Sequence, residues 1–312
     1  MNKHLILMCL GIFLMVKPLL AVDSLPDDLT KLSLEALMSI EVTTASRRTE
    51  KLSDTTAAVY VITQEDIRRS TATTIPNLLR MVPGMQVANI DANKWAISSR
   101  GFNSRFATKL LVLIDGRSVY SPLFSGVFWD AQDVVLEDVE RIEIIRGPGA
   151  TLWGANAVNG VINIITKSSE ETQGFLLSSG GGNKEKFFGT IRYGGSTSDR
   201  THYRIYSKYF YRDSQVDSTG KKSDDQWYQW RSGFRIDSNT YYENSFTFQG
   251  DIYQGQSGET ASYPIAQTQF PFYKKMTENH DNNLFGGNLL GRFRHSVSDL
   301  SELVFQAYYD HN

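Results

Sequence analysis

Residues 141–167 of this 312-residue chain read RIEIIRGPGATLWGANAVNGVINIITK, and this stretch decides how the region around it folds. Both ends of the stretch are rich in isoleucine and valine, whose β-branched side chains favour strands. The middle contains glycine and proline, which interrupt regular elements and allow tight turns. The stretch therefore predicts a strand, a glycine-rich bend, a turn of small residues and a second strand.

The residues before this stretch alternate between short strands and short helices. Thr63 and Asp66 have the spacing of a helix cap, Pro83-Gly84 ends a helical pattern, and Asp115-Gly116 predicts a tight turn. We expect strands at 57–63, 96–100 and 110–114, helices at 64–69 and 75–82, and a short helical or turn segment at 134–140. Together these elements predict a small α+β domain over residues 55–168.

From residue 172 onward, apolar and polar side chains alternate with a period of two, in segments separated by turns or polar loops. Membrane β-barrel strands alternate in this way, but so do the strands of a soluble sandwich with one wet face. Aromatic residues near the strand ends favour the barrel, as does the alternation of short connections (196–200, 238–239) with long ones (213–225, 254–282). We count about seven antiparallel strands by this pattern.

The N-terminus has the order of a secretory signal peptide over residues 1–21: Lys3 and His4, an apolar run over 5–16, and Leu-Leu-Ala at 19–21. A membrane anchor is the alternative, but the run is shorter than the roughly 20 residues that span a bilayer. Cys9 is the only cysteine and lies in this run, so the exported chain could form no disulfide and no thiolate metal site. Because no later segment resembles a membrane helix, entry into a membrane would require a barrel.

Five motifs lie within residues 99–167: Arg146-Gly147-Pro148, Trp153-Gly154, the segment from Asn159-Gly160 to Lys167, Ser99-Arg100-Gly101, and residues 112–116. Together they resemble the plug domain of TonB-dependent outer-membrane receptors. The resemblance implies a plug followed by a membrane β-barrel, which has about 22 strands in plugged transporters. It divides the chain into a signal peptide (1–21), a periplasmic segment (22–54), a plug domain (55–168) and the N-terminal part of the barrel (169–312).

The barrel expected from this resemblance is incomplete, since the chain supplies only about seven of the expected strands. An open sheet would leave unpaired backbone groups in lipid, at a cost of several kcal/mol for each group. We therefore expect the chain to be the N-terminal portion of a longer receptor.

An extended, β-prone run precedes the expected plug, and it consists of Ile40, Glu41, Val42, Thr43, Thr44 and Ala45. Family members carry a TonB box in this position, and the box joins a periplasmic energy-transducing partner by strand addition. The resemblance assigns that role to these six residues. An ordinary linker strand is the alternative.

The resemblance also implies that arginines of the plug face acidic groups of the barrel wall, and it gives this seating role to Arg100 and Arg146. A buried arginine needs carboxylate partners, whereas a solvated arginine on the plug surface is the alternative. The other motif positions are Gly101, Asp115, Gly116, Gly147, Pro148, Trp153, Gly154, Asn159 and Gly160.

Outward-pointing plug loops form the lower substrate-contact surface in the family, and two segments of this chain fit that description. Residues 89–95 supply Asp91, Asn93, Lys94 and Trp95, and the loop at 117–130 supplies Tyr120, Phe124, Phe128 and Trp129. Aromatic side chains in such loops also anchor the loop to its surroundings, which is the alternative reading.

The sequence offers no catalytic site and implies no cofactor. Gly149 and Gly154 have the glycine spacing of a phosphate loop, but Ala155-Asn156 replaces the required Lys-Ser/Thr. The histidines after the signal peptide lack paired metal-ligand spacing, and the formal net charge of −2 shows no basic footprint for nucleic acid. We therefore expect neither an enzyme, nor a metal site, nor a nucleic-acid partner.

The resemblance implies a receptor in the outer membrane of a Gram-negative bacterium, in contact with its lipid, that takes up a scarce nutrient. The expected substrate is a metal chelate or another small molecule, most of all a ferric siderophore or cobalamin, and the energy comes from the TonB complex. A passive porin or adhesin and a non-functional truncated receptor are the alternatives, and the sequence does not select among substrates.

Overall fold

The computed structural model describes residues 41–42, 50–51, 57–216, 220–240, 244–268, 270–298 and 301–312. All of them belong to one compact unit, Ile40–Asn312. The expected signal peptide and four of the six residues of the expected TonB box lie outside the described residues.

None of the helices in the described residues is long and apolar enough to cross a membrane.

Residues 57–173 form an α+β domain around a five-stranded sheet. The order of its strands is β3 (Val59–Thr63), β8 (Val139–Arg146), β9 (Gly160–Thr166), β6 (Leu110–Ile114) and β7 (Arg117–Ser118). All neighbouring pairs are antiparallel except β6 and β9. The stretch 141–167 thus supplies the two central strands, and its isoleucines at 142, 144, 162 and 164 are fully buried in the core.

Short helices and a separate hairpin complete the α+β domain. These elements are α3 (Gln64–Arg69), α4 (Ile75–Leu79), α5 (Ala150–Trp153), the 3-10 turns η4 (Leu136–Asp138) and η5 (Glu170–Thr172), and the hairpin of β4 (Met85–Asn89) with β5 (Trp95–Ser99). A two-residue pair, β1 (Glu41–Val42) with β2 (Glu50–Lys51), precedes them. Thr63 caps α3 with a full capping box, as predicted, because its hydroxyl accepts from Asp66 N while the Asp66 carboxylate accepts from Thr63 N.

The second part of the chain is a seven-stranded antiparallel sheet in sequence order. Its strands are β10 (Gly174–Gly180), β11 (Glu185–Ser198), β12 (Thr201–Arg212), β13 (Trp227–Asn239), β14 (Asn244–Ala266), β15 (Tyr273–Ser298) and β16 (Ser301–His311). Seven strands are the number that the alternating pattern predicts, so this part of the prediction is confirmed. Short connections lie at one end of the sheet and longer ones at the other, as in outer-membrane barrels.

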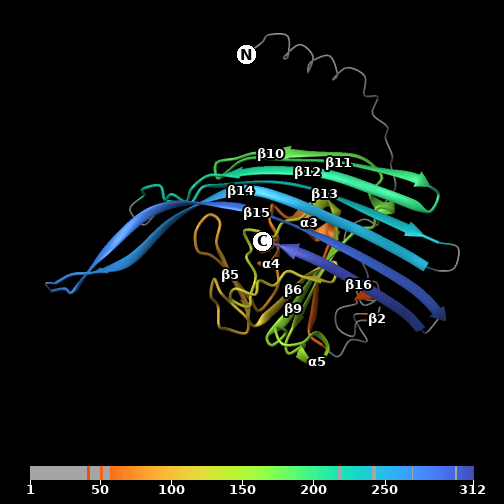
Figure 1. Ribbon diagram of the computed structural model, residues 1–312, viewed down its shortest axis with the longest axis horizontal. Helices are drawn as coiled ribbons and strands as arrows, with labels where there is room; N and C mark the ends of the chain where they lie inside the picture. Colours follow the sequence, from red (N-terminus) through yellow and green to blue (C-terminus); the bar gives the residue numbers. More distant parts are fainter. Residues whose placement is uncertain are drawn as a thin grey trace, which may run out of the picture. The chain divides into compact units, whose positions relative to one another are not determined.

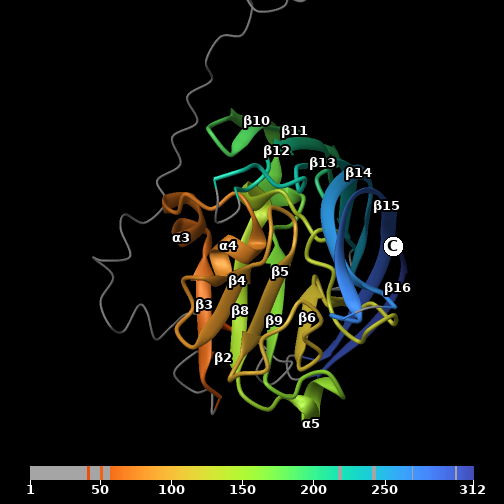
Figure 2. The same cartoon turned by 90° about the vertical axis from the view of Figure 1, so that its left-hand side faces the viewer.

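The sheet has a polar face and an apolar face. On β12, Arg204 and Lys208 point toward the α+β domain and are only 5% and 8% exposed, whereas Ile205 and Tyr209 point away and are 53% and 37% exposed. Figure 2 shows the α+β domain on the concave side of the curved sheet. We call the concave face inward and the convex face outward.

One connection differs from the prediction. The sequence predicts a long loop over 254–282, but β14 and β15 continue through most of it and pair up to Ala266 and Tyr273. The neighbouring strand β13 ends at the pair Trp227–Ser257, so residues 258–266 and 273–281 form a two-stranded arm beyond the rest of the sheet (Figure 1). The prediction was wrong because the arm has no buried face, and its backbone pairing therefore leaves no apolar pattern in the sequence.

Candidate functional site

The turn between β6 and β7 presents a carboxylate to the seven-stranded sheet. Asp115 and Gly116 are its two central residues, with φ angles of 50° and 78°. A two-residue hairpin turn of this kind needs left-handed backbone, which glycine adopts freely and aspartate tolerates. Asp115 Oδ1 accepts from Thr166 N at 2.9 Å and Oδ2 accepts from Thr166 Oγ1 at 2.8 Å. The end of β9 therefore holds this carboxylate in place.

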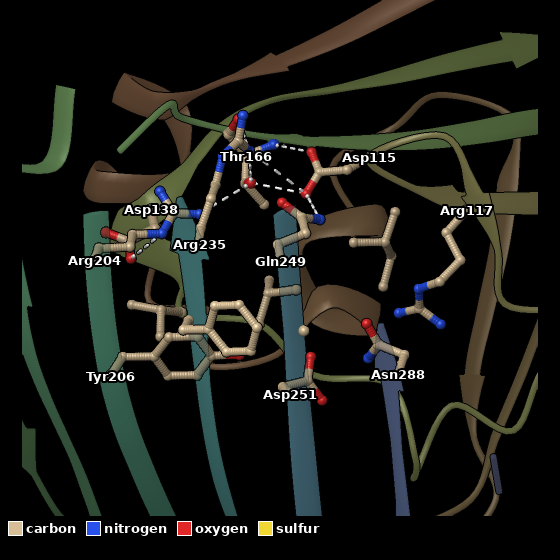
Figure 3. A pocket seen from close by; sticks show the side chains of 15 residues that line it. Asp115, Arg117, Asp138, Thr166, Arg204, Tyr206, Arg235, Gln249, Asp251 and Asn288 are labelled. Carbon is tan, nitrogen blue, oxygen red and sulfur yellow. Dashed lines mark hydrogen bonds and ion pairs between the residues drawn. The ribbon is translucent and has the colours of Figure 1, made fainter. Parts of the chain in front are cut away.

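The same carboxylate binds the inward face of the sheet (Figure 3). Gln249 Nε2 on β14 donates to Asp115 Oδ2 at 2.9 Å, and Arg235 Nη1 on β13 lies 3.9 Å from that oxygen. Arg292 on β15 donates to the backbone carbonyl of Asp115. A single turn residue thus joins the α+β domain to three consecutive strands.

Two arginines of the sheet also bind the C-terminal end of β9. Arg204 Nη1 donates to Lys167 O at 2.7 Å, and its Nη2 donates to Thr166 Oγ1 at 3.1 Å. Arg235 Nη1 donates to the same hydroxyl at 2.9 Å. The end of β9 is therefore fixed from two neighbouring strands.

Three further cations of the sheet bind the loop over residues 130–138. Lys208 Nζ donates to Asp133 Oδ1 and Val134 O at 2.8 Å each, Arg231 Nη2 to Ala131 O at 2.5 Å, and Arg192 Nη1 to Asp138 Oδ1 at 2.5 Å. Across most of this contact the sheet supplies the donors and the α+β domain supplies the acceptors. The ion pair between Arg117 and Asp310 is an exception, because here the domain supplies the cation and β16 supplies the carboxylate.

A small polar cavity lies inside this contact. Its volume is about 50 Å³, and Asp115, Arg204, Tyr206, Arg235 and Asp251 are among the residues that line it (Figure 3). A cavity of this size with polar walls suits a few water molecules. The contact is therefore a polar seat, and its cavity is too small to bind a nutrient.

The resemblance assigns Arg100 and Arg146 to plug seating, but the structure shows both side chains bound to backbone carbonyls of the α+β domain itself. Arg100 Nη2 donates to Arg146 O at 2.9 Å, and Arg146 Nη1 donates to Pro83 O at 2.9 Å. Among the described residues, the ion pairs between domain and sheet involve other side chains. The seating role of these two arginines stays a prediction.

The glycine-rich motif shapes the bend between β8 and β9. A Cβ atom at Gly160 would lie 2.5 Å from Ile145 O, so only glycine allows these two strands to approach closely. Gly147 N donates to Asn159 O at 3.0 Å across the bend. Trp153 packs partly buried against the smaller apolar cluster, while Pro148 and Gly154 are exposed. Gly101, with φ of 95°, follows Arg100 in the loop after β5.

The first expected substrate-contact segment lies against the longer connections of the sheet. Asn93 Nδ2 donates to Asp225 O at 3.1 Å and to Gly258 O at 2.8 Å, and Ala92 N donates to Asp225 Oδ2 at 2.7 Å. Lys94 Nζ is bound to Asp91 Oδ2 at 2.6 Å. Asn93, Lys94 and Trp95 are all buried, so the structure uses these residues to anchor the segment.

The second expected segment forms an aromatic cluster. Phe124 contacts Phe106 and Phe128 edge-on, with ring centroids 4.9 and 4.8 Å apart. Tyr120 Oη donates to Ser125 Oγ at 2.9 Å, and Trp129 is buried in the main core.

Three exposed apolar side chains lie on the two loops that carry this cluster, and the sequence did not point to them. They are Phe102 (80% exposed), Leu123 (84%) and Phe106 (50%). Nearby, Arg105 Nη1 lies 3.5 Å from Glu259 Oε1 at the base of the arm. Phe102 and Phe106 lie three and seven residues after the end of β5 at Ser99, in a segment whose irregular composition gave no periodic signal. We call Phe106, Phe124 and Phe128 the aromatic cluster of the domain.

Burial shifts two pKa values in this region. Burial raises the pKa of the Asp130 carboxyl above its usual range, while Arg105 and Lys94 oppose that shift. Burial lowers the pKa of Lys167, whose Nζ donates to Glu137 O at 3.0 Å. Neither group has the neighbours of a general acid or base that would form a catalytic site.

Only Glu41 and Val42 of the expected TonB box are described. They pair with Lys51 and Glu50 respectively, and Val42 is fully buried. In the described part of the chain, no group of three or more histidine, cysteine, aspartate or glutamate side chains could hold a metal ion.

Comparison with known proteins identifies the class of fold. Residues 51–161 match the family model of the TonB-dependent Receptor Plug Domain. The Vitamin B12 transporter BtuB of Vibrio vulnificus is 36% identical over 156 residues, which are 48% of this chain and 25% of that protein. BtuB of Vibrio cholerae is 37% identical over 139 residues, or 45% of this chain and 22% of that protein. The chain thus spans about a quarter of the length of these curated relatives.

Solved structures share the same arrangement. FpvA of P. aeruginosa, bound to a heterologous pyoverdine and iron, matches 86% of this chain and 36% of its own, with a TM-score of 0.64 and 16% identity. The copper transporter OprC matches 81% of this chain and 37% of its own, with a TM-score of 0.60 and 18% identity. At such identities the likeness shows the fold alone: a plug domain with part of a barrel sheet.

Proposed function

We propose that this chain serves energised uptake of a metal chelate across the outer membrane. The reason is that it combines the plug domain of a TonB-dependent receptor with part of its barrel sheet. The α+β domain is the plug, and the seven-stranded sheet is part of the wall. The related proteins are named as transporters and receptors rather than enzymes. The proposed substrate is a metal chelate, and the proposed energy source and periplasmic partner is the TonB complex.

The observation that carries this proposal is the polar seat between plug and wall. Asp115 alone receives donors or cations from three wall strands. A passive porin leaves its lumen open to water, whereas here a folded domain covers the inward face through charged, buried contacts. Such contacts hold a plug in place but can also be exchanged for water, which suits a plug that must move during transport.

The aromatic cluster supports a large substrate with an apolar surface. Its member Phe106 is 50% exposed, Phe102 and Leu123 on the same loops are 80% and 84% exposed, and Arg105 beside Phe106 is paired with the base of the arm. Exposed aromatic side chains contribute strongly to recognition because they bury large areas on contact. Cobalamin is the first candidate because the curated relatives with 36–37% identity are named vitamin B12 transporters. A ferric siderophore is the second, since several receptors with this fold are named for such ligands.

Uptake measurements in cells that express the receptor test the proposal. We expect labelled cobalamin or a ferric siderophore to accumulate in these cells, and a protonophore or loss of the TonB complex to abolish accumulation but not surface binding. Accumulation that survives the protonophore would support the passive porin instead. A heat-modifiable, detergent-resistant band on a gel serves as the control for a folded barrel, and its absence would support the truncated, non-functional alternative.

A further inference from the structure

The outward face of the wall has a gap in its apolar side chains. The register of β13 to β16 alternates bulky residues with glycine there: Gly250 lies opposite Phe234 and Leu289, and Gly287 lies opposite Ile252. The gap forms a depression of about 680 Å³ on the outward face. We call it the glycine notch, and its floor is the backbone at Gly250 and Gly287.

Side chains at the floor could not fill the notch without moving the sheet. A Cβ at Gly250 would lie 2.4 Å from Asn288 O, and a Cβ at Gly287 would lie 2.6 Å from Asp251 O. Both distances are shorter than real Cβ contacts, so the wall can present only bare backbone at these two positions. The notch is therefore a fixed feature of the strand register.

The sides of the notch are almost entirely carbon. Ile252, Phe285, Leu289 and Tyr309 surround it and are between 46% and 67% exposed. The outward polar groups are the Ser232 hydroxyl, the Tyr309 hydroxyl and the His311 ring, and no carboxylate or long cationic side chain points into it from the outward face. This chemistry excludes an ionic or strongly polar ligand and selects a hydrocarbon.

Two rows of aromatic residues place the notch within the membrane. Phe246, Phe293 and Phe305 form one row near the short connections, and Tyr211 and Tyr228 form another, level with Gln256. Ten residues separate these rows along β14. With a rise of about 3.3 Å per residue and a tilt of about 45°, that is roughly 23 Å, close to the apolar band of about 25 Å in outer-membrane barrels.

The centre of the notch lies in the extracellular half of that band. It runs from the level of Gly250 to that of Gln254, which are four and eight residues above Phe246. These positions are roughly 9 and 19 Å above the lower aromatic row. A hydrocarbon at this height belongs to the outer leaflet.

We propose that the glycine notch binds one acyl chain of an outer-leaflet lipid. The inference rests on the proposed function only in that the outward face meets the membrane. If the notch were empty, the side chains that line it would have no atoms to contact on the side that faces the notch. A flexible acyl chain would restore those dispersion contacts. Because the floor is rigid backbone, the bound chain is held longer than the lipids that surround the rest of the barrel.

Lipid retention tests this site on the purified receptor that contains this chain. The receptor is washed in detergent and weighed intact by native mass spectrometry. We expect about one retained outer-leaflet lipid, and at least a ten-fold lower occupancy in Ser232→Trp, whose indole fills the notch. Ser179→Trp, at another outward serine on β10, is the matched control and should retain the lipid.

A second pair of variants keeps the test decisive if the tryptophan substitutions disturb folding. Ile252→Ala removes one side of the notch and should reduce retention, whereas Ile191→Ala, at an outward isoleucine of similar exposure on β11, should not. Heat-modifiable migration checks that each variant is folded.

Equal retention in the notch variants and their controls would overturn the site, as would wild-type receptor without lipid. A retained glycerophospholipid would contradict the outer-leaflet assignment, and a dimer mass would mean that a second copy covers the notch. Failure of energised uptake with lipid retained would overturn the proposed function alone.

Discussion

Asp115 joins the plug to the wall through both carboxylate oxygens and its backbone carbonyl. Replacing it with alanine leaves the buried Thr166 amide and the Gln249 side chain without their acceptor. Breaking a buried charged contact by removing one partner costs about 3 kcal/mol or more. We therefore expect Asp115→Ala to speed hydrogen exchange at the Thr166 amide by about 150-fold, since 1.36 kcal/mol corresponds to a factor of ten.

Asp199→Ala is the control for this change, because Asp199 is exposed in the turn between β11 and β12. It should leave exchange at Thr166 unchanged. Exchange in Asp115→Ala that matches the wild-type rate would show that the seat does not depend on this carboxylate.

Asp130 makes the stability of the plug depend on pH. Burial raises the pKa of its carboxyl in the folded plug, so the folded state holds the proton more tightly than the unfolded state. The contribution of this group to stability is therefore fully present below its unfolded pKa and is lost as the pH rises through the folded pKa. Asp130→Asn should accordingly be more stable than the wild type at neutral pH, and the advantage should shrink on acidification.

Denaturant unfolding of the plug, followed in both proteins from acidic to neutral pH, measures this difference. An advantage of the asparagine variant that stays constant with pH would show that Asp130 is not the titrating group.

The arm of β14 and β15 extends beyond every neighbouring strand, so it can be shortened without touching the wall. We expect that deletion of residues 261–278, with a two-residue Asn-Gly turn joining Thr260 to Asn279, leaves the folded barrel intact, because pairing with β13 ends at Ser257. Substrate affinity should fall, because the deletion removes the surface that extends from the base of the arm, where Glu259 contacts the plug loops. Heat-modifiable migration and a binding titration measure the two effects, and loss of the folded band would show that the arm supports the wall.

Elements whose signals are local were predictable from the sequence, and contacts between distant residues were not. The capping box at Thr63 and Asp66 and the turn at Asp115-Gly116 each depend on neighbours within four residues. By contrast, Asp115 and Gln249 are 134 residues apart, and the sequence gives no reason to pair them rather than Arg100 with a wall acid. The strands β4 and β5 show the intermediate case: β5 was expected, but no strand was expected at the alternating, half-exposed β4.

The proposed transport requires that a force from the periplasm reach the plug. The expected TonB box is the place where that force would enter, and its residue Val42 pairs with Glu50. Strand addition to a partner uses backbone hydrogen bonds more than side chains. The proposed uptake would therefore depend on the backbone N–H groups of this segment rather than on a particular side chain.

Val42→Pro tests this dependence because proline removes the backbone N–H and fixes φ. We expect energised uptake to fall at least ten-fold while substrate binding at the cell surface is retained, since the aromatic cluster and the polar seat lie elsewhere in the chain. Val42→Ala keeps the N–H and is the matched control: it should transport near the wild-type rate, because the side chain contributes little to an added strand. Uptake that is unchanged in Val42→Pro would remove residues 40–45 as the TonB box, and a loss of binding together with uptake would show that the change disturbs the plug instead.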